Sequence, residues 1–252
     1  MTARWLPEAL LRTDAHTRVF CLPHAGAGAS TYRLWGRELP PELQMCPVQL
    51  PGRENRLGEP PIDDARALTR ALADGLRPFL DRPYVLFGHS MGALLAYELT
   101  CEFRRQAVPL PVHLFLSAHR APHLPGGLPH VHLFDRAAFR AELRHIDGTP
   151  AAVLEQEELM DIAEPILRAD FRLCETYAWE PVEPLDVPMS IFGGEEDPKV
   201  APRVLEPWQQ HTTHPMRLRL FPGGHLFIQQ RRADVVSALL EDLRIETVRL
   251  TL

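Results

Sequence analysis

The chain has 252 residues and a formal net charge of −6, with 27 lysines and arginines against 33 aspartates and glutamates. This length can bury a full core, and an acidic balance without a sustained basic stripe argues against nucleic acid as a partner. No window reaches the length of a membrane span, and the N-terminus contains no apolar stretch suited to a signal peptide. We therefore expect a cytoplasmic protein, with residues 1–252 forming one domain.

Short apolar runs alternate with helical patterns along the first eighty residues. Residues 18–22 and 43–50 are apolar runs that predict strands. Residues 30–39 and 63–80 carry apolar side chains at helical spacing and predict helices. Between the first strand and the first helix lies the loop at residues 23–28, whose small side chains let the backbone approach a ligand closely.

The stretch YVLFGHSMGALLAYELTC at residues 84–101 contains a G-x-S-x-G motif. Residues 84–87 are apolar and predict a buried strand, whereas residues 93–101 are rich in Ala and Leu and predict a helix. A strand, a sharp turn and a helix form the context of a nucleophile elbow, in which two glycines permit the tight fold and expose a serine. This context predicts Ser90 as a nucleophile.

The second half of the chain contains three further strands, separated by a long helical segment. The predicted strands cover residues 112–117, 187–192 and 216–221, and a final helix covers residues 227–243. Between the first two of these strands, helical patterns replace strand patterns, and we place an insertion at about residues 128–180. This order predicts an α/β-hydrolase fold, with a mostly parallel sheet, helices on both faces and a helical lid.

A serine hydroxyl needs a base to become nucleophilic, and the base needs an acid to orient it. In this fold the chain order is serine, then acid, then histidine. His225 lies in the Gly-rich loop PGGHL, directly after the last predicted strand and before the last helix. The sequence therefore predicts His225 as the base for Ser90.

Three acids follow the strand at residues 187–192, namely Glu195, Glu196 and Asp197. We select Asp197, because the turn GGEEDP lets the third acid point back over the ends of the strands while the first two remain in solvent. No carboxylate follows the strand at residues 112–117 closely, which supports this selection.

The oxyanion of such a reaction needs two backbone N–H donors. Met91, directly after the nucleophile, supplies one by position, and the loop after the first strand supplies the other, for which we select Ala25. The neighbouring His24 either orients this loop or the substrate, or has a purely structural role.

Seven short motifs together resemble the type II thioesterases, the stand-alone editing hydrolases of polyketide synthases and nonribosomal peptide synthetases. They are PHAGAG at 23–28, LPGRENR at 50–56, FGHSMGA at 87–93, RAPH at 120–123, LRADF at 167–171, FGGEEDP at 192–198 and PGGHLF at 222–227. The resemblance implies a Ser90, Asp197 and His225 triad that needs no cofactor, and a mobile lid at residues 133–178. It also implies an acyl thioester on the phosphopantetheine arm of a carrier protein as substrate.

Carrier domains are acidic, so an acidic enzyme needs a local basic patch to bind them. We identify Arg53, Arg56 and Arg120 as candidates near the mouth of the site, and solvated surface arginines without a binding role are the open alternative. We expect the protein to act as a monomer.

Four histidines, His119, His123, His130 and His132, fall within a short segment rich in Pro and Gly. Their spacing fits no standard zinc pattern, so we expect no metal site. Two alternatives to an editing thioesterase remain. One is a general carboxylester or lipid hydrolase on the same fold, and the other is a carrier-protein-binding module that has lost catalysis.

Overall fold

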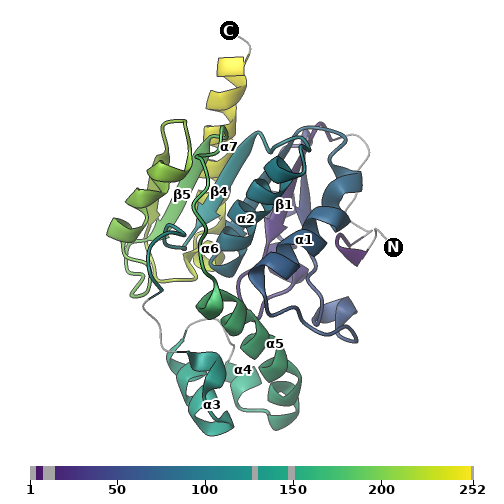
Figure 1. The fold of residues 1–252 in the computed structure, drawn as a ribbon, viewed down its shortest axis with the longest axis vertical. Coiled ribbons are helices and arrows are strands. Elements are labelled where there is room, and N and C mark those ends of the chain that lie inside the picture. Colours follow the sequence, from purple (N-terminus) through teal and green to yellow (C-terminus); the bar gives the residue numbers. More distant parts are fainter. Residues whose placement is uncertain (1–3, 8–14, 127–129, 147–150, 251–252) are drawn as a thin grey trace.

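Six strands form one sheet at the centre of the molecule (Figure 1), in the order β2-β1-β3-β4-β5-β6. The computed structural model describes residues 4–7, 15–126, 130–146 and 151–250. All five pairs of neighbouring strands in this sheet are parallel. The strands are β1 (Thr17–Leu22), β2 (Leu43–Pro47), β3 (Tyr84–His89), β4 (His113–Ser117), β5 (Met189–Gly194) and β6 (Arg217–Phe221). The predicted α/β fold with a parallel sheet is confirmed.

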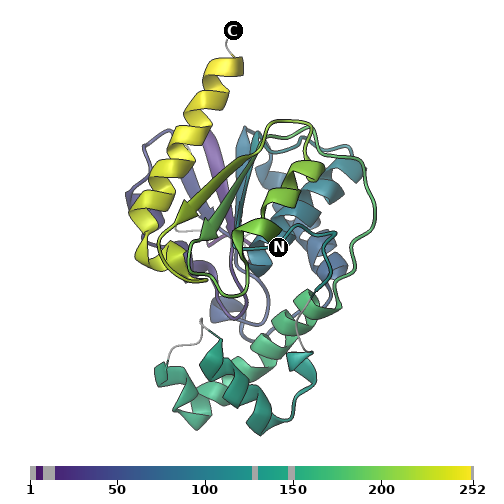
Figure 2. The ribbon, with the colours of Figure 1, turned by 90° about the vertical axis from the view of Figure 1, so that its left-hand side faces the viewer.

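Helices cover both faces of this sheet, which explains why every residue of β3, β4 and β5 is buried. On β1, Phe20 and Leu22 pack into the core under α1 (Ala65–Leu76) and α2 (Met91–Arg105). Val19 and Cys21 point to the opposite face, where they join the core under α6 (Phe227–Gln230) and α7 (Arg232–Leu250). Figure 2 shows α7 running along its face of the sheet, away from α1 and α2.

Helix α1 shows how local sequence sets the bounds of an element. The Asp64 side chain accepts a hydrogen bond from the Ala67 amide at 2.8 Å and caps the N-terminus. Leu68, Leu72 and Leu76 recur at intervals of four and are all buried. The α-helical pattern ends there because Pro78 has no N–H to donate, and a 3-10 turn, η6 (Arg77–Phe79), follows.

The prediction of one continuous helix at residues 30–39 is wrong. The structure has two separate 3-10 turns there, η3 (Ala29–Tyr32) and η4 (Trp35–Arg37). Tyr32 and Trp35 are both buried in the core under α7, and a spacing of three residues matches the 3-10 repeat. The Tyr32 hydroxyl also donates to the Leu22 carbonyl at 2.8 Å, which ties this segment to the end of β1.

A helical insertion lies between β4 and β5 and gathers at one end of the molecule (Figures 1 and 2). Within it, residues 155 and 156 are not helical and separate two helices. The elements of the insertion are η7 (Val131–Leu133), α3 (Arg136–His145), α4 (Ala151–Leu154) and α5 (Glu157–Thr176). They share a small core of their own, formed by Val131, Phe139, Leu143, Met160 and Leu167.

Three short 3-10 turns complete the described elements, and they are η5 (Glu54–Arg56), η8 (Pro202–Val204) and η9 (Glu206–His211). The last predicted helix is divided at Arg231 into α6 and α7. Among the helices that the structure describes, none combines the length and the apolar character that crossing a membrane requires.

Candidate active site

Ser90 sits at the tip of a sharp turn between β3 and α2. Its backbone has φ 53° and ψ −118°, in a region that residues with a side chain rarely adopt. Such a conformation costs on the order of 1–3 kcal/mol and persists only where the surroundings hold it. Here the Ser90 amide donates to the Ser117 carbonyl at 2.7 Å, at the end of the neighbouring strand β4.

The two glycines of the motif are required by close backbone approach. A Cβ on Gly88 would lie 2.0 Å from the Gly92 carbonyl oxygen, and a Cβ on Gly92 would lie 2.1 Å from the Leu22 carbonyl oxygen. Both distances are far below van der Waals contact, so no other residue fits without moving the main chain. The turn therefore packs directly against the end of β1.

A continuous chain of hydrogen bonds links the three residues predicted as nucleophile, base and acid. His225 Nε2 lies 2.9 Å from Ser90 Oγ, and His225 Nδ1 lies 2.7 Å from Asp197 Oδ2. With the carboxylate ionised, Nδ1–H donates to Asp197, which leaves Nε2 free to accept the Ser90 proton. The structure thus brings together three side chains from the ends of β3, β5 and β6.

Asp197 is held as a carboxylate. Burial alone raises its pKa, but the hydrogen bond and the positive charge of His225, with the Lys199 and Val200 amides, outweigh burial and lower the pKa overall. These amides donate to Oδ1 at 2.9 and 3.1 Å. Glu195 and Glu196, the other two acids of this loop, are exposed.

The loops that carry Asp197 and His225 are joined by backbone contacts. Gly194 at the end of β5 pairs with Phe221 at the end of β6, and the Glu195 amide donates to the Phe221 carbonyl at 2.9 Å. A Cβ on Gly194 would lie 2.5 Å from the Gly224 carbonyl oxygen. Because the two loops touch through main chain, the acid and the base keep a fixed separation.

Two more histidines pack around the base. His89 Nδ1 lies 2.8 Å from Ser117 Oγ, and its ring is 5.5 Å from His225 and 5.9 Å from His24. Burial, helped by the positive charges of His225 and Arg53, lowers the pKa of His24 to about 4. His24 is therefore neutral at pH 7, and its buried Nδ1 has no hydrogen-bond partner among the described residues.

The two amides predicted as oxyanion donors flank the elbow. Met91 is the first residue of α2, where a helix leaves its N–H groups without intrahelical acceptors. Ala25 lies in the loop after β1, which Gly92 brings against the elbow. Neither amide donates a hydrogen bond to another residue that the structure describes.

The three predicted surface arginines do not form an exposed basic patch. Arg53 is only 4% exposed and pairs through both terminal nitrogens with Asp170, at 2.7 and 2.8 Å. Arg56 is also buried, pairs with Glu59 and stacks 4.4 Å over the Trp5 ring. Arg120 is half-buried, and its Nε donates to the Leu124 carbonyl at 3.1 Å. These contacts contradict the expectation of an exposed patch, because internal partners occupy two of the guanidinium groups and partly bury the third.

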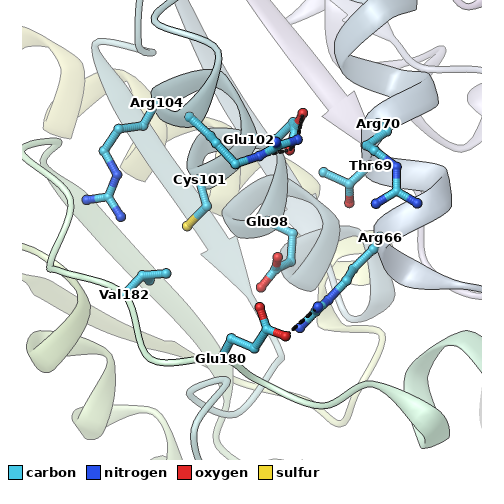
Figure 3. A pocket seen from close by; sticks show the side chains of 10 residues that line it. Arg66, Thr69, Arg70, Glu98, Cys101, Glu102, Arg104, Glu180 and Val182 are labelled. Carbon is cyan, nitrogen blue, oxygen red and sulfur yellow. Dashed lines mark hydrogen bonds and ion pairs between the residues drawn. The ribbon is translucent and has the colours of Figure 1, made fainter.

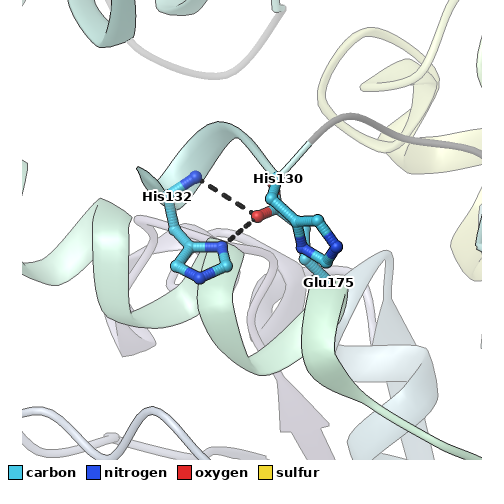
Figure 4. A group of neighbouring side chains, drawn as sticks. All are labelled: His130, His132 and Glu175. Atoms are coloured by element: carbon cyan, nitrogen blue, oxygen red, sulfur yellow. Dashed lines mark hydrogen bonds and ion pairs between the residues drawn. The ribbon is translucent and has the colours of Figure 1, made fainter. Parts of the chain in front are cut away.

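The four clustered histidines separate in the structure. His119 Nδ1 donates to the Arg120 carbonyl, and His123 Nδ1 lies 2.7 Å from His211 Nε2. His130 and His132 instead meet Glu175 of α5 (Figure 4), with one ligand atom of each within 4.8 Å of the others. This trio has the donors of a metal site.

Glu175 already has other partners. Its carboxylate contacts His132 Nδ1 and accepts hydrogen bonds from the Val131 and His132 amides at 3.0 and 3.2 Å. It therefore caps η7, the turn that opens the insertion, and a metal ion would compete with this cap.

A separate cavity of about 570 Å³ lies on the outer side of α1 and α2 (Figure 3). Two ion pairs lie in its walls, Arg66 with Glu180 and Arg105 with Glu102, both at 2.6 Å. Cys101, which lines it, lies eleven residues after Ser90, which is roughly 16 Å along the helix axis at 1.5 Å per residue. The cavity is therefore remote from the elbow.

Asp170 is a residue that the sequence analysis did not single out. It is fully buried on α5, and its Oδ2 accepts a hydrogen bond from the Gly26 amide at 2.7 Å. Asp170 lies inside the LRADF motif, and Leu167 and Leu173, three residues before and after it, are both buried. An acid between these two leucines was its signal in the sequence.

Known proteins resemble this chain over most of its length. The family model described as a thioesterase domain matches residues 17–244. The gramicidin S biosynthesis protein GrsT of Aneurinibacillus migulanus is 36% identical over 242 residues, which cover 96% of this chain and 94% of GrsT.

Two solved structures are similar over almost the whole chain. The RedJ thioesterase from the prodiginine pathway of Streptomyces coelicolor has a TM-score of 0.84 at 39% identity, covering 95% of this chain and 92% of RedJ. BorB, a type II thioesterase from the borrelidin biosynthetic cluster, has a TM-score of 0.85 at 36% identity, with 94% and 96% covered.

Proposed function

The chain belongs to the thioesterase family, and from this premise we propose that it is an editing hydrolase that releases acyl groups from the phosphopantetheine arm of carrier proteins. The observation that carries the proposal is the hydrogen-bonded series from Ser90 through His225 to Asp197. The relatives support the carrier-protein substrate, since YbtT is named as a type II thioesterase from the yersiniabactin NRPS/PKS biosynthetic pathway and BorB as a type II thioesterase from the borrelidin biosynthetic cluster.

The reaction begins when Ser90 attacks the thioester carbonyl. His225 Nε2 accepts the hydroxyl proton as the Oγ–carbon bond forms, and the imidazolium that results is stabilised by Asp197. The carbonyl oxygen becomes an oxyanion that accepts hydrogen bonds from the Met91 and Ala25 amides. Each such donor lowers the barrier by roughly 3–4 kcal/mol.

The tetrahedral intermediate then collapses. The carbon–sulfur bond breaks, His225 returns its proton to the leaving thiolate, and the acyl group remains on Ser90 as an ester. Water repeats the attack with His225 as base, and the free acid leaves while Ser90 regains its proton. No step requires a cofactor.

The helical insertion serves as a lid in this proposal, on a chain that forms one domain and acts as a monomer. Support comes from α5, because its Asp170 contacts Gly26 next to the proposed oxyanion donor. An acyl chain that extends from Ser90 past this loop would therefore meet the insertion.

The test is a hydrolysis panel of acyl-carrier proteins of varied chain length, run beside acyl-thioesters of a small thiol and matched oxygen esters. We expect carrier-bound thioesters to have the highest kcat/KM. Ser90→Ala should abolish turnover, whereas Ser237→Ala, which changes an exposed serine of α7, should leave it intact. Equal rates on thioesters and oxygen esters without gain from a carrier would assign a general esterase. Carrier binding without any hydrolysis by the unaltered chain would assign a binding module.

A further inference from the structure

A buried ion pair joins the helical insertion to the body of the protein. Asp170 of α5 has no exposed side-chain surface, and Arg53, which precedes η5, is 5% exposed at its side chain. The guanidinium donates from both terminal nitrogens to both carboxylate oxygens, at 2.7 and 2.8 Å. This two-point geometry fixes the direction of both side chains as well as their separation.

The same pair also holds the loop after β1. Asp170 Oδ2 accepts the Gly26 amide hydrogen at 2.7 Å, and Arg53 Nη1 donates to the Ala27 carbonyl at 3.1 Å. Ala27 in turn donates from its amide to the His24 carbonyl at 3.1 Å. That carbonyl and the Ala25 N–H belong to one planar peptide unit, so orienting one orients the other.

Packing from α5 adds to these hydrogen bonds. Leu167 lies one helical turn before Asp170, and a Cβ on Gly26 would come within 2.6 Å of its Cδ2. Gly26 has φ 77°, a backbone conformation that favours glycine. The loop therefore lies directly against the side chains of α5, which leave no room for a side chain at position 26.

We propose that Asp170, held in place by Arg53, is a positioning residue that orients the Ala25 oxyanion donor. The contacts that dock α5 on the body then also orient the Ala25 N–H toward the oxyanion. This inference rests on the proposed function, in which Ala25 stabilises the oxyanion. Such donors act through preorganisation, and a displacement of about 1 Å can cost roughly 10² in rate.

A second ion pair, in which the carboxylate is equally buried, provides a matched control. Asp242 of α7 is fully buried, accepts from Arg219 at 2.6 Å and from the Ser190 hydroxyl at 2.6 Å. It lies between α7 and the strands β5 and β6, and its carboxylate contacts Ser190, Arg217 and Arg219, which all belong to these two strands. Asp242→Asn therefore removes a comparable buried charge without touching the proposed oxyanion donor.

The experiment compares Asp170→Asn with Asp242→Asn on an acyl-carrier thioester. We expect Asp170→Asn to lower kcat by about 10-fold to 100-fold with KM nearly unchanged, since the lost interaction acts in the transition state. An acyl trifluoromethyl ketone, which forms a tetrahedral adduct with the serine, should lose affinity by a similar factor, while the product acid binds as before. Asp242→Asn should keep both kcat and inhibitor affinity.

A double variant separates positioning from folding. Arg53→Met with Asp170→Leu replaces the buried pair by apolar side chains, an exchange that is often neutral for stability. The Gly26 amide still loses its acceptor, so kcat should stay low in a stably folded protein. Wild-type kcat in both the double variant and Asp170→Asn would overturn the inference, as would an equal loss of kcat in Asp242→Asn. Hydrolysis that survives Ser90→Ala would instead overturn the proposed function.

Discussion

The carbonyl of Leu22 lies directly over Gly92, so that a methyl group on this glycine would come within 2.1 Å of the oxygen. Leu22 is the last residue of β1, and Gly92 is the second residue of α2. This contact places the loop after β1 beside the N-terminus of α2. This close approach brings together the two segments that carry the amides proposed as oxyanion donors, those of Ala25 and Met91.

Replacing Gly92 with alanine tests this contact. Alanine favours a helix by about 1 kcal/mol over glycine, but a clash of Cβ with main chain forces the backbone apart and costs about 1–3 kcal/mol. We expect Gly92→Ala to lower the free energy of unfolding in urea and to reduce turnover by more than tenfold. Gly58→Ala is the control, because a Cβ there meets nothing within 4 Å. Equal behaviour of the two variants would show that the close approach is dispensable.

The buried His24 makes stability depend on pH. Burial, together with the positive charges of His225 and Arg53, lowers the pKa of His24 to about 4, below the usual 6.5. Between these values the unfolded chain binds the proton more readily, so stability is lost as pH falls from about 6.5 toward 4. The loss between pH 7 and pH 5 amounts to about 2 kcal/mol for this group.

Urea unfolding at pH 7 and pH 5 measures that difference. His24→Gln should remove about 2 kcal/mol of the pH dependence, whereas His16→Gln, at an exposed position, should retain all of it. An unchanged pH dependence in His24→Gln would mean that His24 is protonated as easily in the folded protein as in the unfolded chain.

Arg56 stabilises the fold from inside. Its Nη1 donates to the Gln49 carbonyl at 2.9 Å, and its guanidinium stacks 4.4 Å over Trp5. Hydrogen bonds to charged groups contribute about 1.5–3 kcal/mol, so Arg56→Ala should lower the free energy of unfolding by about 2 kcal/mol. The KM for acyl-carrier substrates should remain as it is. Arg37→Ala, at an exposed position, should change neither quantity. A higher KM at unchanged stability would instead make Arg56 a docking residue.

The elbow was predictable because its signals are local. A buried apolar run, two glycines around a serine and an Ala- and Leu-rich helix follow one another within eighteen residues. Asp197 and His225 could be selected as well, since the carboxyl ends of parallel strands meet at one edge of the sheet. Each lies in a short loop after a predicted strand, which limits how far its side chain can be from Ser90.

The environment of Arg53 could not be predicted, because its partner is 117 positions away in the sequence. An arginine in a polar loop has the same local sequence whether it faces solvent or a buried carboxylate. The 3-10 turns at Tyr32 and Trp35 were missed for a related reason. Their spacing fits a helix in general, and only packing against the sheet selects the tighter form.

Chelation should leave hydrolysis unaffected. His130, His132 and Glu175 offer metal donors, yet the carboxylate already caps η7, and the proposed reaction uses none of the three. Prolonged treatment with EDTA should therefore leave kcat/KM within about twofold, in line with a mechanism that needs no metal. A loss that added Zn²⁺ restores in the unaltered chain, but not in His132→Ala, would assign this trio a role in activity.

The acid of the proposed triad can be separated from its two neighbours by amide substitution. Asp197→Asn keeps the shape of the side chain but cannot hold His225 in the tautomer that accepts the Ser90 proton, so kcat should fall by about 10⁴. Glu195→Gln and Glu196→Gln change exposed carboxylates and should stay within a few-fold of the unaltered rate. Steady-state turnover of one acyl-carrier substrate by all three variants decides the matter. A large loss in Glu195→Gln or Glu196→Gln, with Asp197→Asn still active, would move the orienting role to another acid of the loop and would require that loop to rearrange before catalysis.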